Sequence, residues 1–319
     1  MNFHLEIPLK QNQNQIDYNS KILLLGSCFA ENIGDKFQYF KFQTLQNPFG
    51  ILFHPLAIET LVYNAVHQKV YTEEDLFYLN EQWHCFDAHS RLSHTSKEQL
   101  LARLNTSIIE TFEFLKCASH ICITLGTAWA YRYLETNIIV ANCHKVPQKL
   151  FEKELLSIED ISKSLQNITT LISEINPKSK LIFTVSPVRH IKDGFVENTL
   201  SKAHLISSIH HLIKDNTSLS ETEAYFPSYE IQMDELRDYR FYKADLLHPS
   251  DLAVDYIWEK FKQVWISTSA QHIMDEIGDI QKGLAHQPLN PNSEMHRFFL
   301  NNLEHKIQNL KSQLPFIQF

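Results

Sequence analysis

Short runs of apolar residues stand out from a chain whose apolar and polar positions otherwise alternate at helical spacing. Three of these runs cover residues 22–25, 121–125 and 181–185, and each is rich in aliphatic or β-branched side chains. The first two end at Gly26 and Gly126, and the third is followed by a Ser-Pro pair. An apolar run of this length that stops at a turn signal is typical of a strand buried on both faces. We therefore predict three buried strands that end at one edge of a sheet.

The segments between these runs have the period of amphipathic helices. After Gly26, the side chains of Phe29, Ile33 and Phe37 recur every four residues and share one helical face. Strands that alternate with helices favour a mostly parallel sheet with helices on both sides. Further helices are predicted at 99–115, 158–175, 201–213, 251–265 and 295–314.

These elements predict a three-layer α/β/α sandwich followed by a C-terminal helical extension. Residues 1–265 are expected to form the α/β domain, because the amphipathic segment 251–265 is typical of its last helix. Residues 266–319 are expected to form the extension, whose helix follows a proline-containing break at 288–291.

Composition narrows the class of protein. A chain of 319 residues that is 44% apolar can bury a full core. The formal net charge is -8 and no Lys/Arg-rich run is interleaved with aromatic residues, so we expect no nucleic-acid partner. The five cysteines form no CxxC pair, and reduced thiols are the default expectation. The N-terminus lacks the pattern of a secretory signal and no apolar run reaches the length of a membrane span, so a cytoplasmic protein is expected.

Ser27 follows the first predicted strand and begins the first predicted helix. In open α/β sheets ligands bind at this edge, where helix N-termini present free N–H groups. The position would let a serine hydroxyl attack an acyl carbonyl while the N–H groups stabilise the oxyanion. A serine that only caps the helix explains the same sequence equally well.

Asp245 and His248 supply the base that such a serine needs. Three residues apart near the start of a helix, the two side chains can project from one turn, so that the carboxylate or a nearby backbone carbonyl orients the imidazole. The alternative is a capping aspartate beside a partly buried histidine.

Seven ordered motifs resemble the bacterial GSCFA-domain family, which we group with the SGNH (GDSL-like) hydrolases. The resemblance covers about residues 20–265. The motifs are Gly26-Ser27-Cys28-Phe29-Ala30, Asn47-Pro48-Phe49-Gly50, Thr124-Leu125-Gly126-Thr127-Ala128-Trp129, Val140-Ala141-Asn142-Cys143-His144-Lys145, Ser186-Pro187-Val188-Arg189-His190, Tyr225-Phe226-Pro227-Ser228-Tyr229-Glu230 and Asp245-Leu246-Leu247-His248-Pro249.

The resemblance implies a site as well as an SGNH or flavodoxin-like fold. Ser27 takes the place of the nucleophile, Gly50 that of an oxyanion donor, and Asp245 with His248 that of the catalytic pair. The usual oxyanion asparagine is missing, because Gly126 is followed by threonine and alanine. One lost donor weakens transition-state stabilisation by about 3 kcal/mol, so another group must substitute or the activity is modest.

Four side chains are candidates for the missing donor. Thr127, Asn47, Asn142 and His144 all fall within the shared motifs. Three of them also have a structural explanation: Asn47 before a proline is typical of a turn, Asn142 of a strand end, and Thr127 of a helix cap.

Other polar residues can be interpreted either as part of a functional site or as purely structural. Arg189 and His190 follow a predicted strand end, where they can bind an anionic group of a substrate or form a salt-bridged loop. The His- and Asp-containing segment 83–94 reads as a substrate-contacting loop or plain structure, since its spacing defines no metal site. Cys28 is expected to be inert packing at the helix start.

Together these features predict a serine esterase that acts on an O-acyl ester, such as an acetylated glycan or a small-molecule ester. It would form an acyl-enzyme on Ser27 without a metal or organic cofactor. An O-acyltransferase of the same fold and a non-catalytic binding or scaffold module remain the alternatives.

Overall fold

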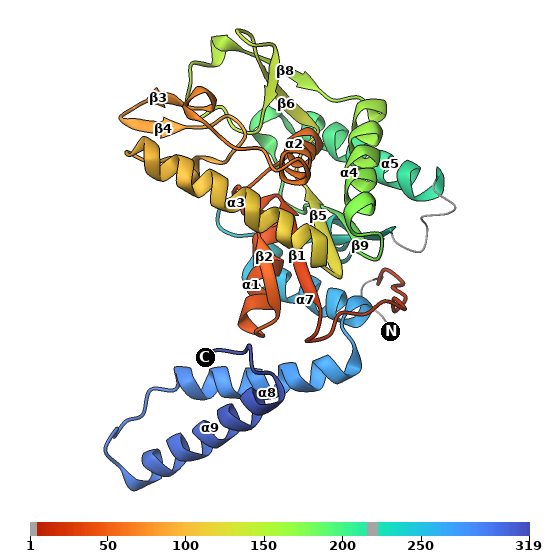
Figure 1. Cartoon of the computed structure of the whole chain (residues 1–319). Coiled ribbons are helices and arrows are strands. Elements are labelled where there is room, and N and C mark those ends of the chain that lie inside the picture. The colour runs from red at the N-terminus through yellow and green to blue at the C-terminus, as the bar shows by residue number, and fades with distance from the viewer. Residues whose placement is uncertain (1–4, 216–222) are drawn as a thin grey trace.

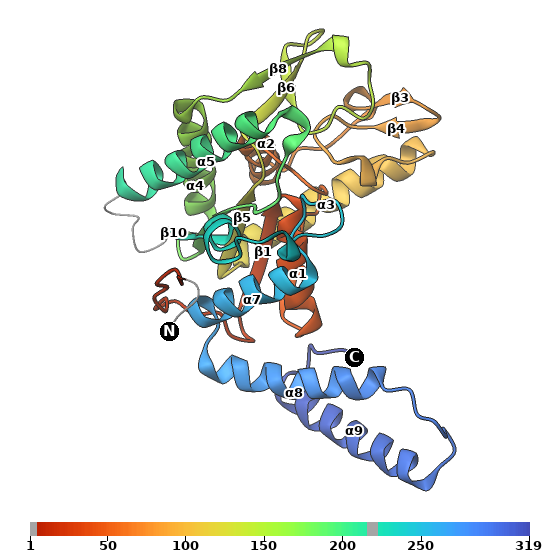
Figure 2. The ribbon, with the colours of Figure 1, turned by 180° about the vertical axis from the view of Figure 1, so that it is seen from behind.

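A five-stranded parallel sheet forms the centre of the protein (Figures 1 and 2). The computed structural model describes residues 5–215 and 223–319. The strand order is β10-β9-β5-β1-β2, and every neighbouring pair is parallel. The predicted mostly parallel sheet is therefore confirmed. Its strands are β1 (Lys21–Gly26), β2 (Gln43–Gln46), β5 (His120–Leu125), β9 (Lys180–Val185) and β10 (Glu223–Phe226).

Alternate side chains of the sheet face two separate layers of helices. In β1, Leu23 and Leu25 belong to one apolar core, whereas Ile22 and Leu24 belong to another. This arrangement confirms the predicted three-layer α/β/α sandwich. The first core is covered by α2 (Pro55–Val66), α3 (Lys97–Cys117), α4 (Ile158–Ile175) and α5 (Phe195–Asp215), the second by α1 (Cys28–Tyr39) and α7 (Asp251–Trp265), and the one-turn α6 (Ser228–Glu230) follows β10.

A smaller antiparallel sheet, which the sequence analysis missed, lies beyond the carboxyl ends of the central strands. Both views show β6 and β8 above β1 and β5 (Figures 1 and 2). Its strand order is β7-β6-β8. The sheet therefore lies over the edge of the central sheet where α/β proteins bind ligands. Its strands are β6 (Trp129–Tyr133), β7 (Ile138–Val140) and β8 (Phe151–Leu155), and a separate hairpin joins β3 (Phe77–Leu79) to β4 (Gln82–His84).

The chain ends in two helices that extend from the opposite end of the molecule (Figures 1 and 2). They are α8 (Thr268–Ala285) and α9 (Glu294–Gln313), and the predicted C-terminal helical extension is thereby confirmed. The predicted helix at 295–314 corresponds to α9, whereas the bounds of α8 were not predicted. Buried Met274 and Ile277 of α8 and Ile307 of α9 belong to the same core as α1 and α7. Within the described residues, none of the helices combines the length and apolar character needed to cross a bilayer.

The turn from β1 into α1 depends on Gly26. Its φ of +126° is unfavourable for other residues, and an added Cβ would lie 2.0 Å from the carbonyl oxygen of Thr124. We therefore expect Gly26→Ala to lower the free energy of unfolding by about 3 kcal/mol or more. Gly278→Ala is the matched control, since a Cβ inside α8 would make an ordinary 3.8 Å contact with Phe40.

Urea denaturation checks this pair of variants. We expect Gly278→Ala to gain about 0.5–1 kcal/mol, because alanine favours a helix interior and restricts the unfolded chain. A Gly26→Ala protein as stable as the wild type would contradict the proposed role of this turn.

Candidate active site

A cavity of about 840 Å³ lies between the carboxyl ends of the central strands and the smaller sheet. This volume is in the range of small-molecule binding sites, and the position is the one that open α/β sheets use for ligands. Segments far apart in sequence contribute to it. Among its lining residues are Cys28 at the start of α1, Phe53 and His54 before α2, Thr127 after β5, Trp129 and Tyr131 in β6, Asn142 and Cys143 after β7, Arg189 and His190 after β9, and His248 before α7.

Ser27 serves as the N-cap of α1 and does not line this cavity. Its hydroxyl oxygen accepts a hydrogen bond from the N–H of Phe29 at 3.2 Å, and the residue is 0% exposed. Its own N–H donates to the carbonyl of Thr124 at 2.9 Å. This bond occupies the group that we expected in an oxyanion hole. The structure thus gives Ser27 the capping role that the sequence left as the alternative.

Cys28, the first residue of α1, is partly exposed and does line the cavity. Burial raises the pKa of its thiol, and the carboxylate of Glu31 adds to the rise, whereas the ammonium of Lys202 lowers it. A thiol with a raised pKa is protonated at neutral pH, so it needs a base before it can attack.

His248 and Asp245 form the expected pair. The Nδ1 of His248 lies 2.6 Å from Oδ2 of Asp245, while Oδ1 of Asp245 accepts hydrogen bonds from the N–H groups of Leu247 and His248 at 2.9 and 3.0 Å. These two backbone bonds, followed by the imidazole, lower the pKa of Asp245 to about 2. The carboxylate is therefore charged and favours the proton on Nδ1, which leaves Nε2 free to accept one.

A left-handed residue shapes the turn that carries this pair. Leu246 has a φ of +60°, and the carbonyl of Leu247 accepts a hydrogen bond from the N–H of Arg189 at 3.1 Å. The loop after β9 and the turn before α7 are thus fastened together, which places His248 and Arg189 in the same cavity.

The side chain of Lys202 in α5 places a buried amine beneath the site. Its Nζ donates to the carbonyl oxygens of Gly126 and Ser186 at 2.7 Å each, joining the ends of β5 and β9. Burial lowers the pKa of Lys202 to about 7. Two charge-assisted bonds compensate for part of this desolvation.

His190 is neutral in the physiological range. Burial, with smaller contributions from Lys202 and His248, lowers its pKa to about 3. Its buried Nε2 makes no hydrogen bond to any residue that the structure describes. As an anion ligand it would therefore act through a single N–H, while the guanidinium of Arg189 supplies the charge.

Two of the four candidates for the missing oxyanion donor, Thr127 and Asn142, line the cavity. The hydroxyl of Thr127 lies 3.1 Å from that of Ser201 and accepts from the N–H of Trp129. The side-chain oxygen of Asn142 accepts from the N–H of His144 at 2.8 Å. Thr127 is thus tied into the turn after β5, and Asn142 keeps its amide N–H₂ available.

Gly50, Asn47 and His144 lie outside the cavity and act within turns. The N–H of Gly50, expected as an oxyanion donor, instead donates to the carbonyl of Asn47 at 2.7 Å, and His89 occupies the space of a Cβ. The side-chain oxygen of Asn47 accepts from the N–H of Gly26 at 2.9 Å. The Nε2 of His144 faces the carbonyl of Cys85 at 2.8 Å. These hydrogen bonds stabilise loops, and none of the three residues lines the cavity.

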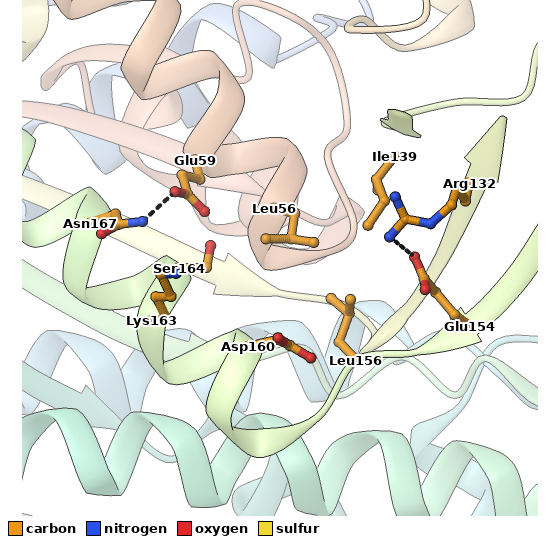
Figure 3. Close-up of a pocket in the computed structure, with 10 residues that line it drawn as sticks. All are labelled: Leu56, Glu59, Arg132, Ile139, Glu154, Leu156, Asp160, Lys163, Ser164 and Asn167. Carbon is orange, nitrogen blue, oxygen red and sulfur yellow. Dashed lines mark hydrogen bonds and ion pairs between the residues drawn. The ribbon is translucent and has the colours of Figure 1, made fainter. Parts of the chain in front are cut away.

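A second cavity, of about 390 Å³, is lined by residues of α2, α4 and the smaller sheet (Figure 3). Four of its polar side chains pair with one another: Arg132 pairs with Glu154 at 2.8 Å, and Asn167 donates to Glu59 at 2.7 Å. The buried hydroxyl of Ser164 has no partner among the described residues. Its lining contains neither a histidine nor a cysteine. It therefore offers no nucleophile and base of the kind found in the larger cavity.

Sequence reasoning discounted Cys28 and missed Lys202. A signal for Lys202 does exist, since it falls on the same helical face as Leu205 and Ile209, both of which are buried. A lysine at a core position of an amphipathic helix needs buried partners, and here they are two carbonyl groups at strand ends.

Comparison with known protein families agrees with the predicted resemblance. A model described as the GSCFA family matches residues 21–261, and one described as GSCFA domain protein, C-terminal domain, matches residues 277–319. No curated protein matches the chain. The GSCFA resemblance is thereby confirmed, whereas the grouping with SGNH hydrolases stays a prediction.

Proposed function

We propose that this protein, which belongs to the GSCFA family, is an acyl hydrolase or acyltransferase whose attacking atom is the Cys28 sulfur. One observation carries the proposal: Cys28 and His248 line the same cavity, and Asp245 holds His248 at 2.6 Å. The sequence favours Ser27 for the attack on an O-acyl ester. The capping bond and complete burial of Ser27 favour the neighbouring residue instead.

In the first half-reaction the acyl group moves from the ester oxygen to the Cys28 sulfur, and one proton moves through His248. His248 Nε2 takes the thiol proton of Cys28 as the sulfur attacks the acyl carbonyl carbon. A C–S bond forms, and the negative charge develops on the carbonyl oxygen beside the N-terminus of α1, where the positive end of the helix dipole stabilises it. The N–H groups of Phe29 and Ala30 are already bonded to Ser27. The C–O bond then breaks, and the imidazolium returns its proton to the departing alkoxide.

The second half-reaction decides between hydrolase and transferase. The thioester on Cys28 is attacked by water or by an alcohol such as a sugar hydroxyl, with His248 again taking the proton. The C–S bond breaks and the thiol is regenerated. The cavity of about 840 Å³ is large enough for an alcohol acceptor as well as for water.

A specific observation favours a second candidate function, a non-catalytic binding or scaffold module. The N–H groups of Ser27 and Gly50 are both used in backbone hydrogen bonds, which removes two expected oxyanion donors. A protein of this kind would bind a ligand in the cavity and turn over nothing.

Rapid mixing with p-nitrophenyl acetate distinguishes the two functions. We expect a burst of about one equivalent of nitrophenol followed by slower steady turnover, because acylation of Cys28 precedes deacylation. The matched control is Cys143→Ala, which removes another partly exposed thiol of the same cavity and should leave the burst intact. Absence of both burst and turnover would favour the scaffold module.

A further inference from the structure

We infer that the cavity selects small esters that carry a negative charge, bound chiefly by Arg189 and Lys192. This inference rests on the proposed function, because it assigns a substrate class to the same site.

The lining is cationic in a protein that is acidic overall. Among the cavity residues, Arg91, Lys145, Arg189 and Lys192 are positive and Asp193 is negative, whereas the whole chain has a formal net charge of -8. Asp193 is neutralised by an ion pair with Lys153 outside the lining. A local excess of one sign in a concave surface concentrates ligands of the opposite sign.

Most of these positive side chains form no ion pair with a carboxylate among the described residues. Arg91 pairs with Glu31 at 2.6 Å, but in the described part of the chain Lys145, Arg189 and Lys192 form no ion pair. The guanidinium of Arg189 lies 5.2 Å from the ring centroid of Phe195. A half-buried arginine held by an aromatic ring keeps its donors in a fixed orientation for a carboxylate or phosphate group.

His190 adds a hydrogen-bond donor to the lining without adding charge, because burial lowers its pKa to about 3. His54 does not, since its Nε2 faces the carbonyl of Val140 at 3.1 Å and its Nδ1 accepts from the N–H of Ala57. The buried Nε2 of His190 has no partner among the described residues, and it follows Arg189 directly in the chain. An anionic group at Arg189 would therefore find a neutral donor beside it.

The remaining wall is apolar and aromatic. Phe53, Trp129, Tyr131 and Phe151 line it, and the volume of about 840 Å³ far exceeds the space that an acetyl group needs. The substrate is thus expected to carry a chain or ring that contacts these side chains, in addition to its charged group.

Two alkylating reagents of similar size test the charge preference without requiring catalysis. Iodoacetate is anionic and iodoacetamide is neutral, and mass spectrometry gives the rate of each at Cys28. We expect the iodoacetate to iodoacetamide rate ratio at Cys28 to exceed that of free mercaptoethanol by about tenfold or more. The ratio should fall at about 1 M salt, which screens the cavity charges.

Variants assign the effect to its residues. The double variant Arg189→Gln/Lys192→Gln should bring the ratio close to that of mercaptoethanol. The ratio is the measured quantity because a change in the thiolate fraction of Cys28 alters both rates equally. Lys178→Gln removes an exposed charge before β9, at the opposite edge of the sheet, and should leave the ratio as in the wild type. An unchanged ratio in the double variant would overturn the assignment to Arg189 and Lys192.

The outcomes separate this inference from the function on which it rests. A ratio at Cys28 equal to that of mercaptoethanol would overturn the charge preference and leave the proposed function standing. If neither reagent reaches Cys28 while exposed Cys117 reacts, the open site itself is contradicted. In turnover, an aryl hemisuccinate should have a higher kcat/KM than the neutral aryl butyrate; turnover of neither would contradict the proposed function.

Discussion

Cys28→Ala should abolish turnover of an aryl ester, with a fall in kcat of at least about thousandfold, because it removes the attacking atom. Ser27→Ala should keep turnover within about tenfold of the wild type. That variant loses the N-cap of α1, so its cost should appear as about 0.5–2 kcal/mol of stability instead. Steady-state kinetics and urea denaturation of both proteins measure the two effects.

Cys28→Ser is the informative companion of this pair. It keeps an attacking group at the same backbone position but replaces the thiol with a less nucleophilic hydroxyl, so activity should be lower than in the wild type and higher than in Cys28→Ala. If Ser27→Ala were inactive and Cys28→Ala active, the serine mechanism expected from the sequence would be restored.

His248→Gln should lower kcat by about a hundredfold to ten-thousandfold, because it removes the group that takes the thiol proton in the proposed mechanism. Asp245→Asn should have an effect of similar size. The amide N–H₂ at this position donates a hydrogen bond to Nδ1 and so favours the tautomer with its proton on Nε2, which cannot act as a base.

Two substitutions on exposed residues serve as controls for this pair. His272→Gln changes an exposed histidine of α8, and Asp251→Asn changes a 94% exposed carboxylate at the start of α7. Both should retain wild-type kcat. A His248→Gln protein with wild-type kcat would exclude His248 as the base.

The interaction between Asp245 and His248 should also make the free energy of unfolding depend on pH. The folded pKa of Asp245 is lowered to about 2, below the ordinary value of an unfolded carboxyl. Its contribution is therefore complete above that ordinary value and is lost as pH falls toward the folded pKa. Asp245→Asn should flatten this part of the acid unfolding curve relative to Asp251→Asn.

Strands with continuous apolar runs could be predicted from the sequence, and those with mixed sequences could not. Residues 22–25, 121–125 and 181–185 lie in central strands covered on both faces, so hydrophobic burial alone identifies them. The edge strands β2 and β10 contain Gln43 and Glu223 among their few residues and show no such run. The smaller sheet was missed because β6 and β8 mix apolar with charged residues and β7 has only three residues.

The sequence predicted which segment carries the candidate nucleophile, but not which side chain of that segment faces the cavity. Gly26 correctly marked the strand end, yet the sequence alone does not show which of the next two side chains caps the helix and which faces the cavity. The expected donors at Ser27 and Gly50 were lost to backbone bonds with Thr124 and Asn47, which depend on sheet register and turn geometry. By contrast, the pairing of Asp245 with His248 is local and followed from their spacing.

The position of a trapped acyl group tests the central claim most directly. Wild-type protein is quenched in acid during turnover of p-nitrophenyl acetate, digested, and analysed by tandem mass spectrometry that resolves Ser27 from Cys28. We predict an acetyl group on the Cys28 sulfur, which neutral hydroxylamine removes as it does other thioesters. An acetyl group on the Ser27 oxygen, or none on either residue, would contradict the assignment of Cys28 as the nucleophile.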